Sequence, residues 1–251
     1  MRIVVKLGTS LVAPGGTIAI PRLRALVDQL DLSHQEFLIV SSGAIGSGMS
    51  NLAFSKRPTS VPLMQACAAV GQSLLMHTYE QLFFGKKVVA QLLLSSDDFT
   101  SPLRYKNLQN TLAQLLKLGV IPIINENDSV SVRELVGAFG DNDELSALVA
   151  TAVESDWLLL LTDVDGFYMR NGAKRPHLIR TIRKLTPAME EFCNGKGRLG
   201  TGGMRSKLRA AKLASEAGVH VAIVDGHHPH CISYALQRKI GTYFPPQRRG
   251  Y

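Results

Sequence analysis

The sequence predicts an α/β fold in which helices cover both faces of a mostly parallel sheet. Two observations carry this prediction: short apolar runs rich in β-branched residues recur along the chain, and segments of helical periodicity separate them. That alternation is typical of parallel strands buried on both faces. At 251 residues the chain fits one large domain or two small ones, and we interpret its Pro- and Gly-rich stretches as loops inside one domain.

The expected elements follow from these patterns in chain order. Apolar runs at 3–7, 37–40, 87–94, 120–124, 157–161 and 219–224 predict six strands. Helical periodicity predicts helices over 63–84, 104–118 and 205–217, with Gly71 expected to bend or break the first. Because ligands gather beyond the carboxyl ends of parallel strands, the exits of these strands are the places to search for a site.

Polar or glycine-rich residues follow four of the strands. One such exit would mean little, but four at the same edge of a sheet predict a binding site. The four exits are Val5-Lys6-Leu7-Gly8-Thr9-Ser10, Ser41-Ser42-Gly43-Ala44-Ile45-Gly46-Ser47-Gly48, Asn125-Glu126-Asn127-Asp128-Ser129 and Thr162-Asp163-Val164-Asp165-Gly166.

A further polar stretch, at 140–144, runs directly into an apolar helical pattern. Asp141 or Asn142 can cap that helix. The amide of Asn142 and the carboxylates of Asp143 and Glu144 can hold a small charged ligand, a cation or lysines at the helix N-terminus. An ordinary helix cap in an acidic loop explains the stretch equally well.

Two glycine-rich turns, at 43–48 and 200–207, can offer backbone N–H groups to phosphate oxygens. In the second turn, Arg205 and Lys207 fall early in a helix, where they oppose the helix dipole unless an anion binds. A flexible loop before a solvated basic helix is the alternative. Neither turn has P-loop spacing, and the GxGxxG pattern at 195–200 follows a helical segment, whereas a dinucleotide site requires a strand.

Positive charge gathers in the last third of the chain. The net charge is +8, and residues 170–251 hold 16 Lys or Arg against 4 Asp or Glu. This distribution suggests an anionic ligand, either a nucleotide or a nucleic acid. We expect no nucleic acid, because aromatic residues make up only 6% of the chain and do not interleave with the basic residues as an RNA-stacking surface requires.

The sequence shows few features of a metal-binding, secreted or membrane protein. The three cysteines show no CxxC spacing, and we interpret His227-His228-Pro229-His230 as a solvated loop, so we expect no protein metal site. The N-terminus lacks the features of a signal peptide. No apolar run reaches the ~18 residues of a membrane span. We therefore expect a cytoplasmic protein with no membrane partner.

Two further motifs, Phe139-Gly140-Asp141-Asn142-Asp143 and Gly200-Thr201-Gly202-Gly203-Met204, join the four exits in a fixed order along most of the chain. In this order the motifs resemble the amino acid kinase family, and in particular its branch that acts on glutamate. The resemblance implies a three-layer αβα sandwich. It also implies ATP-dependent phosphorylation of the L-glutamate side-chain carboxylate to L-glutamyl 5-phosphate, the first step of proline biosynthesis. A kinase for aspartate, acetylglutamate or a nucleoside monophosphate is the alternative within the fold.

The resemblance assigns roles to individual residues. Lys6 and Lys207 would contact the phosphates from two sides, and Asp143 would organise these lysines. Mg²⁺ would bind the ATP phosphates, with no metal ligand expected from the protein. Glutamate would be held by Ser42, Asp128 and Asn142, and ATP by Lys6, Thr162, Asp163, Thr201, Gly202, Gly203, Met204, Arg205, Ser206 and Lys207.

Elementary chemistry agrees with these roles. A glutamate carboxylate, with an unperturbed pKa near ~4.3, is already an anionic nucleophile at pH 7, so no general base is required. Two lysines and Mg²⁺ would offset its repulsion from the phosphates. Asp128 suits the α-ammonium group of glutamate, although an Asx turn after the strand also explains this residue.

The same resemblance implies a single domain over residues 1–251. Its substrate-binding part would span about 1–155 and its nucleotide-binding part about 156–251. It further implies a homodimer or homotetramer, and feedback inhibition by proline at an overlapping site. In one respect the chain departs from the family pattern: many bacterial relatives continue into a PUA domain, whereas this sequence stops at Tyr251, and we expect no PUA domain.

Overall fold

The computed structural model describes residues 1–130, 142–170, 175–193 and 202–247, and it confirms the α/β prediction. A seven-stranded sheet has the order β3-β4-β2-β1-β5-β8-β9, and only the last pair of neighbours is antiparallel. Asp141, Thr201 and the 195–200 pattern lie outside the described residues. The strands are β1 (Arg2–Leu7), β2 (Glu36–Val40), β3 (Val89–Leu94), β4 (Ile121–Glu126), β5 (Trp157–Thr162), β8 (His220–Asp225) and β9 (Thr242–Phe244).

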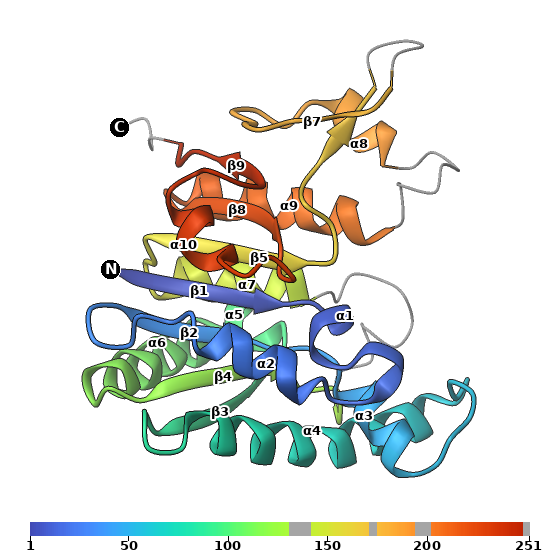
Figure 1. The fold of residues 1–251 in the computed structure, drawn as a ribbon. Coiled ribbons are helices and arrows are strands. Elements are labelled where there is room, and N and C mark those ends of the chain that lie inside the picture. Colours follow the sequence, from blue (N-terminus) through green and yellow to red (C-terminus); the bar gives the residue numbers. More distant parts are fainter. Residues whose placement is uncertain (131–141, 171–174, 194–201, 248–251) are drawn as a thin grey trace.

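Helices cover both faces of this sheet, which gives the three layers seen in Figure 1. The apolar stripe of each helix packs against one face. One layer contains α1 (Thr9–Val12), α2 (Ile20–Val27), α4 (Val61–Phe83) and α10 (Cys231–Leu236), and the other contains α6 (Pro102–Lys117), α7 (Asn142–Ala152) and α9 (Gly202–Glu216). Shorter helical segments are η1 (Pro14–Gly16), α3 (Ala44–Asn51), α5 (Asp97–Thr100) and α8 (Pro187–Phe192).

Alternation along β1 determines which layer each of its side chains meets. Ile3, Val5 and Leu7 pack in the first layer's core, whereas Val4 packs with α6, α7 and α9. Because successive side chains of a strand point to opposite faces, Lys6 lies on the same face as Val4. The sequence thus places the ammonium group of Lys6 toward the helices of the second layer.

Gly71 does not break α4, which continues for 23 residues, so the expected break is wrong. A Cβ added at Gly71 would lie 1.8 Å from the carbonyl oxygen of Ala44, and one at Gly48 would lie 1.7 Å from that of Cys67. The two glycines therefore allow α3 and α4 to pack backbone against backbone. This contact fixes α4 against the helix that begins just after Ser42.

The sequence patterns missed the shortest strands. A two-stranded antiparallel pair, β6 (Tyr168–Met169) and β7 (His177–Leu178), lies apart from the main sheet. Strand β9 forms an antiparallel edge of the seven-stranded sheet, where it pairs with β8. Runs of two or three residues are too short to show an apolar period. Within the part of the chain that the structure describes, no helix is long and apolar enough to cross a membrane.

Candidate active site

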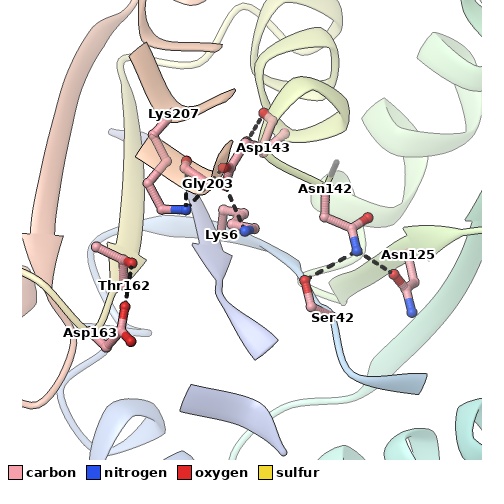
Figure 2. A network of polar contacts seen from close by, with 10 residues as sticks. Lys6, Ser42, Asn125, Asn142, Asp143, Thr162, Asp163, Gly203 and Lys207 are labelled. Atoms are coloured by element: carbon pink, nitrogen blue, oxygen red, sulfur yellow. Dashed lines mark hydrogen bonds and ion pairs between the residues drawn. The ribbon is translucent and has the colours of Figure 1, made fainter. Parts of the chain in front are cut away.

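Two lysines meet at one carboxylate, that of Asp143 (Figure 2). Lys6 Nζ lies 2.6 Å from Asp143 Oδ1, and Lys207 Nζ lies 3.1 Å from Asp143 Oδ2. Lys6 comes from the end of β1, Asp143 from the first turn of α7, and Lys207 from the second turn of α9. We call these three side chains the lysine–aspartate junction. It forms because α7 and α9 both pack on the face of the sheet to which Lys6 points.

The junction is buried and contains two ammonium groups and one carboxylate. Asp143 is 0% exposed, Lys6 3% and Lys207 8%. Burial alone would raise the pKa of Asp143, but the Lys6 and Lys207 ammonium groups outweigh it and hold the pKa below its ordinary value. The carboxylate is therefore ionised at neutral pH. The two ammonium groups are cations to which an anion such as a phosphate is attracted.

Asn142, beside Asp143 in the chain, faces the exits of β2 and β4. Its Nδ2 donates to Ser42 Oγ and to Asn125 Oδ1, both at 3.1 Å. All three side chains are buried. Asn142 Oδ1 is also buried and has no hydrogen-bond partner among the residues that the structure describes. A buried carbonyl oxygen of this kind can accept a hydrogen bond from a ligand.

Asp128 lies in the turn after β4 and is buried. Because β4 pairs with β2 in parallel, the exits that carry Asp128 and Ser42 lie at the same edge of the sheet. The predicted glutamate-binding residues Ser42, Asp128 and Asn142 thus come from adjacent strand exits and the helix start that faces them.

Apart from Lys6, the described residues that are predicted to bind ATP lie on the other side of β1, around β5 and α9. Thr162, at the end of β5, is buried, and its Oγ1 donates to Asp163 Oδ1 at 3.1 Å. Lys207 Nζ turns back along its own helix and donates to the carbonyl oxygen of Gly203 at 3.3 Å. Its positive charge therefore lies near the positive end of the α9 dipole. Met204, Arg205 and Ser206 are half-buried in the same turn.

The stretch His227-His228-Pro229-His230 follows the end of β8, where the backbone N–H of Gly226 donates to the carbonyl oxygen of Thr162 at 2.8 Å. The stretch forms a turn between β8 and α10, with His227 and His230 exposed, as expected of a solvated loop. His227 Nδ1 lies 2.7 Å from Asp225 Oδ1.

Two polar residues of α4 belong to the site's surroundings and were not predicted. Gln72 Oε1 accepts a hydrogen bond of 2.9 Å from Asn125 Nδ2. Tyr79, whose pKa burial raises to about 12, lies with its hydroxyl 2.9 Å from Ser41 Oγ. Both α4 residues are buried polar side chains on a largely apolar helix face, which is the signal that could have identified them.

Comparisons with known proteins show similarity over most of the chain. Residues 1–225 match the amino acid kinase family. A glutamate 5-kinase of Clostridium acetobutylicum is 43% identical over 99% of this chain and 96% of that protein. One of Geobacter sulfurreducens is 45% identical over 98% of this chain and 68% of that protein.

Solved structures of the same fold are more distant in sequence. Carbamate kinase from Giardia lamblia bound to AMP-PNP has a TM-score of 0.67 at 19% identity, covering 98% of both chains. The product complex of isopentenyl phosphate kinase from T. acidophilum has a TM-score of 0.64 at 16% identity, covering 97% of this chain and 100% of that chain. These similarities show a common fold.

Proposed function

The chain belongs to the amino acid kinase family, and from this premise we propose that it transfers the γ-phosphoryl group of ATP to the side-chain carboxylate of L-glutamate. The product is L-glutamyl 5-phosphate, the first intermediate of proline biosynthesis. The observation that carries the proposal is the lysine–aspartate junction, which lies beside the buried amide of Asn142. Groups that can contact a phosphate and groups that can contact a small polar ligand therefore adjoin at two consecutive residues, Asp143 and Asn142.

The chemistry needs positioning and charge compensation. An oxygen of the glutamate carboxylate attacks the γ-phosphorus, the bond from phosphorus to the ADP oxygen breaks, and ADP leaves. Lys6 and Lys207 offset the negative charge on the transferred group and reduce its repulsion from the attacking carboxylate. Asp143 keeps the two ammonium groups together, although they would otherwise repel each other.

The amino-acid end of glutamate needs a different set of groups. Asp128 offers an anion to the α-ammonium group, and Asn142 Oδ1 offers a second acceptor. Ser42 Oγ accepts from Asn142, which leaves its O–H free to donate to the α-carboxylate. The acceptors on Asp128 and Asn142 suit the ammonium group of a free α-amino acid, and the Ser42 hydroxyl suits its carboxylate. N-acetylglutamate has no ammonium group for these acceptors to bind.

The nucleotide would lie across β5, β8 and the start of α9. We propose that Thr162, Asp163 and the 201–207 turn bind ATP, so that residues 156–251 form the nucleotide-binding part and residues 1–155 the substrate-binding part. Strands β1 and β5, which pair in parallel, form the border between these parts.

Kinases of this type use Mg²⁺ to neutralise phosphate charge. We propose that it binds with the ATP phosphates, because the Asp143 carboxylate is already engaged by two lysines. In residues 1–130, 142–170, 175–193 and 202–247, no three His, Cys, Asp or Glu side chains gather as a metal site would require.

An acceptor screen tests the proposed substrate. Purified protein with ATP, Mg²⁺ and hydroxylamine should form a hydroxamate from L-glutamate, because hydroxylamine traps acyl phosphates. ADP release, which reports phosphorylation of any acceptor, should be at least tenfold slower with aspartate, N-acetylglutamate and nucleoside monophosphates, as roughly expected when a buried polar group loses its partner. Product with one of these acceptors and none with glutamate would overturn the substrate assignment.

Assembly, regulation and location complete the proposal. We propose a homodimer or homotetramer, supported by exposed Phe84 and Val88 beside the edge strand β3. Light scattering measures its mass. We also propose feedback inhibition by proline, which shares a charged nitrogen and an α-carboxylate with glutamate and would compete for the same groups. A cytoplasmic location accords with the three free, buried cysteines.

A further inference from the structure

A relay of buried amides connects α4 with the proposed glutamate pocket. Asn125 Nδ2 donates to Gln72 Oε1 at 2.9 Å, and Asn142 Nδ2 donates to Asn125 Oδ1 at 3.1 Å. Gln72 is 7% exposed, Asn125 1% and Asn142 3%. Water therefore has little access to these amides, and each depends on its protein partners for hydrogen bonds.

A backbone group fixes the direction of the relay. Side-chain amide oxygen and nitrogen atoms are ordinarily assigned from their surroundings. Here the backbone N–H of Glu126, which can only donate, lies 3.0 Å from Asn125 Oδ1. That atom must therefore be the oxygen. It follows that Asn125 turns its NH₂ group to Gln72, and that Asn142 turns its NH₂ group to Asn125.

This direction decides what Asn142 presents to a ligand. Because its NH₂ group is held by Asn125 Oδ1 and Ser42 Oγ, its oxygen is the atom left over. That oxygen is buried and has no hydrogen-bond partner among the described residues. A rotated Asn142 amide would instead present a donor, which the α-ammonium group of glutamate cannot accept.

Gln72 is the far end of the relay, and its place is fixed by packing. Its neighbour Gly71 brings the α4 backbone into contact with Ala44 at the start of α3. The Gln72 carbonyl oxygen satisfies the Asn125 NH₂ group. Without that acceptor, the buried NH₂ group of Asn125 would have no hydrogen-bond partner, which is unfavourable. The Asn125 side chain would then shift from the position in which its oxygen accepts hydrogen bonds from Glu126 and Asn142.

We propose that Gln72 is a positioning residue for the amino-acid substrate. Acting through Asn125, it holds the Asn142 amide with its oxygen toward the α-ammonium group of glutamate. This inference rests on the proposed function. Gln72 itself is not assigned any contact with the substrate.

Three variants test the relay. Gln72→Met keeps the shape but removes the acceptor, and Gln72→Glu retains an acceptor whether or not its carboxyl is protonated. Gln81→Met makes the same change on an exposed part of the same helix and is the matched control. The measurements are kcat, the KM for glutamate and the KM for ATP, with thermal unfolding as a check of folding.

We expect Gln72→Met to raise the KM for glutamate about tenfold, the order of effect of one unpartnered buried group. The KM for ATP and kcat should stay within about twofold, because the lysine–aspartate junction is untouched. For Gln72→Glu, kcat and the two KM values should stay within about threefold of those of the parent. For Gln81→Met, the same three constants should be indistinguishable from those of the parent.

Equal rises in both KM values for Gln72→Met would overturn the inference, since a general loss of structure acts on both substrates. So would an unchanged KM for glutamate. If Gln72→Met does not fold, Gln72→Glu decides alone, and a tenfold higher KM for glutamate in that variant contradicts the acceptor role. These outcomes presuppose an active parent protein; a parent that never phosphorylates glutamate refutes the proposed function itself.

Discussion

Replacing Asp143 with Asn would remove the anion that joins the two lysines. The amide keeps nearly the same shape, so the change isolates the charge. Asp143 is 0% exposed and lies 2.6 Å from Lys6 Nζ and 3.1 Å from Lys207 Nζ. In Asp143→Asn, two ammonium groups would remain in a buried site with no carboxylate between them, and they would repel each other.

The expected loss of stability is substantial. Removing one partner of a buried ion pair typically costs about 3–5 kcal/mol. For a domain of this size, each kcal/mol lowers Tm by roughly 2–4 °C, so we expect a Tm about 10 °C lower. Displacement of the lysines by about 1 Å would lower kcat by about 100-fold. ATP should restore part of the lost stability, because phosphates supply the missing negative charge.

Thermal unfolding with and without ATP, together with steady-state kinetics, measures these effects. The matched control is Glu144→Gln, the same carboxylate-to-amide change at the next residue, which is exposed. It should change Tm by less than about 2 °C and kcat by less than about twofold. If Asp143→Asn behaved like Glu144→Gln, the carboxylate would be neither a structural nor a functional link between the lysines.

Three further predictions concern other parts of the molecule. Asp128→Ala should raise the KM for glutamate about 10–100-fold while the KM for ATP stays within about twofold; steady-state kinetics showing equal effects would contradict its assignment. Gly71→Ala should destabilise the fold by about 3 kcal/mol or more in urea unfolding, because its Cβ would meet the Ala44 carbonyl, and unchanged stability would refute that contact. Burial and the nearby Arg238 guanidinium lower the pKa of His220 below its ordinary value of 6.5, so the unfolded chain binds a proton more readily than the folded chain does. Calorimetry should therefore show that His220→Phe loses less stability than the parent as the pH falls from 7 to about 5. Equal losses in the two proteins would exclude a contribution of His220 to this pH dependence.

The strand pattern predicts that the candidate site lies at one edge of the sheet, because parallel strands bring all their carboxyl ends to one edge. Lys6, Ser42, Asp128 and Thr162 all follow from that rule and from the strand pattern. The strand pattern does not predict which of these side chains contact one another. The bond from Lys207 to Asp143 joins residues 64 positions apart, and it depends on how α7 and α9 pack on the second face of the sheet.

Gly71 and Gln72 show where local reasoning failed. Helix propensity predicts a weak point at Gly71, but the close approach of α3 requires a residue without a Cβ there. Gln72 belongs to no motif, and the residue that its side chain contacts, Asn125, is 53 positions away. Propensity and spacing describe short segments, whereas both of these contacts arise from tertiary packing.

The origin of a single oxygen atom tests the central claim most directly. In the proposed reaction, the carboxylate of glutamate attacks phosphorus, and hydroxylamine then attacks the acyl carbon and releases phosphate with the bridging oxygen. Glutamate labelled with oxygen-18 in its side-chain carboxylate should therefore yield phosphate that carries one labelled oxygen in mass spectrometry. Unlabelled phosphate would contradict the account, because water and not glutamate would then have accepted the phosphoryl group.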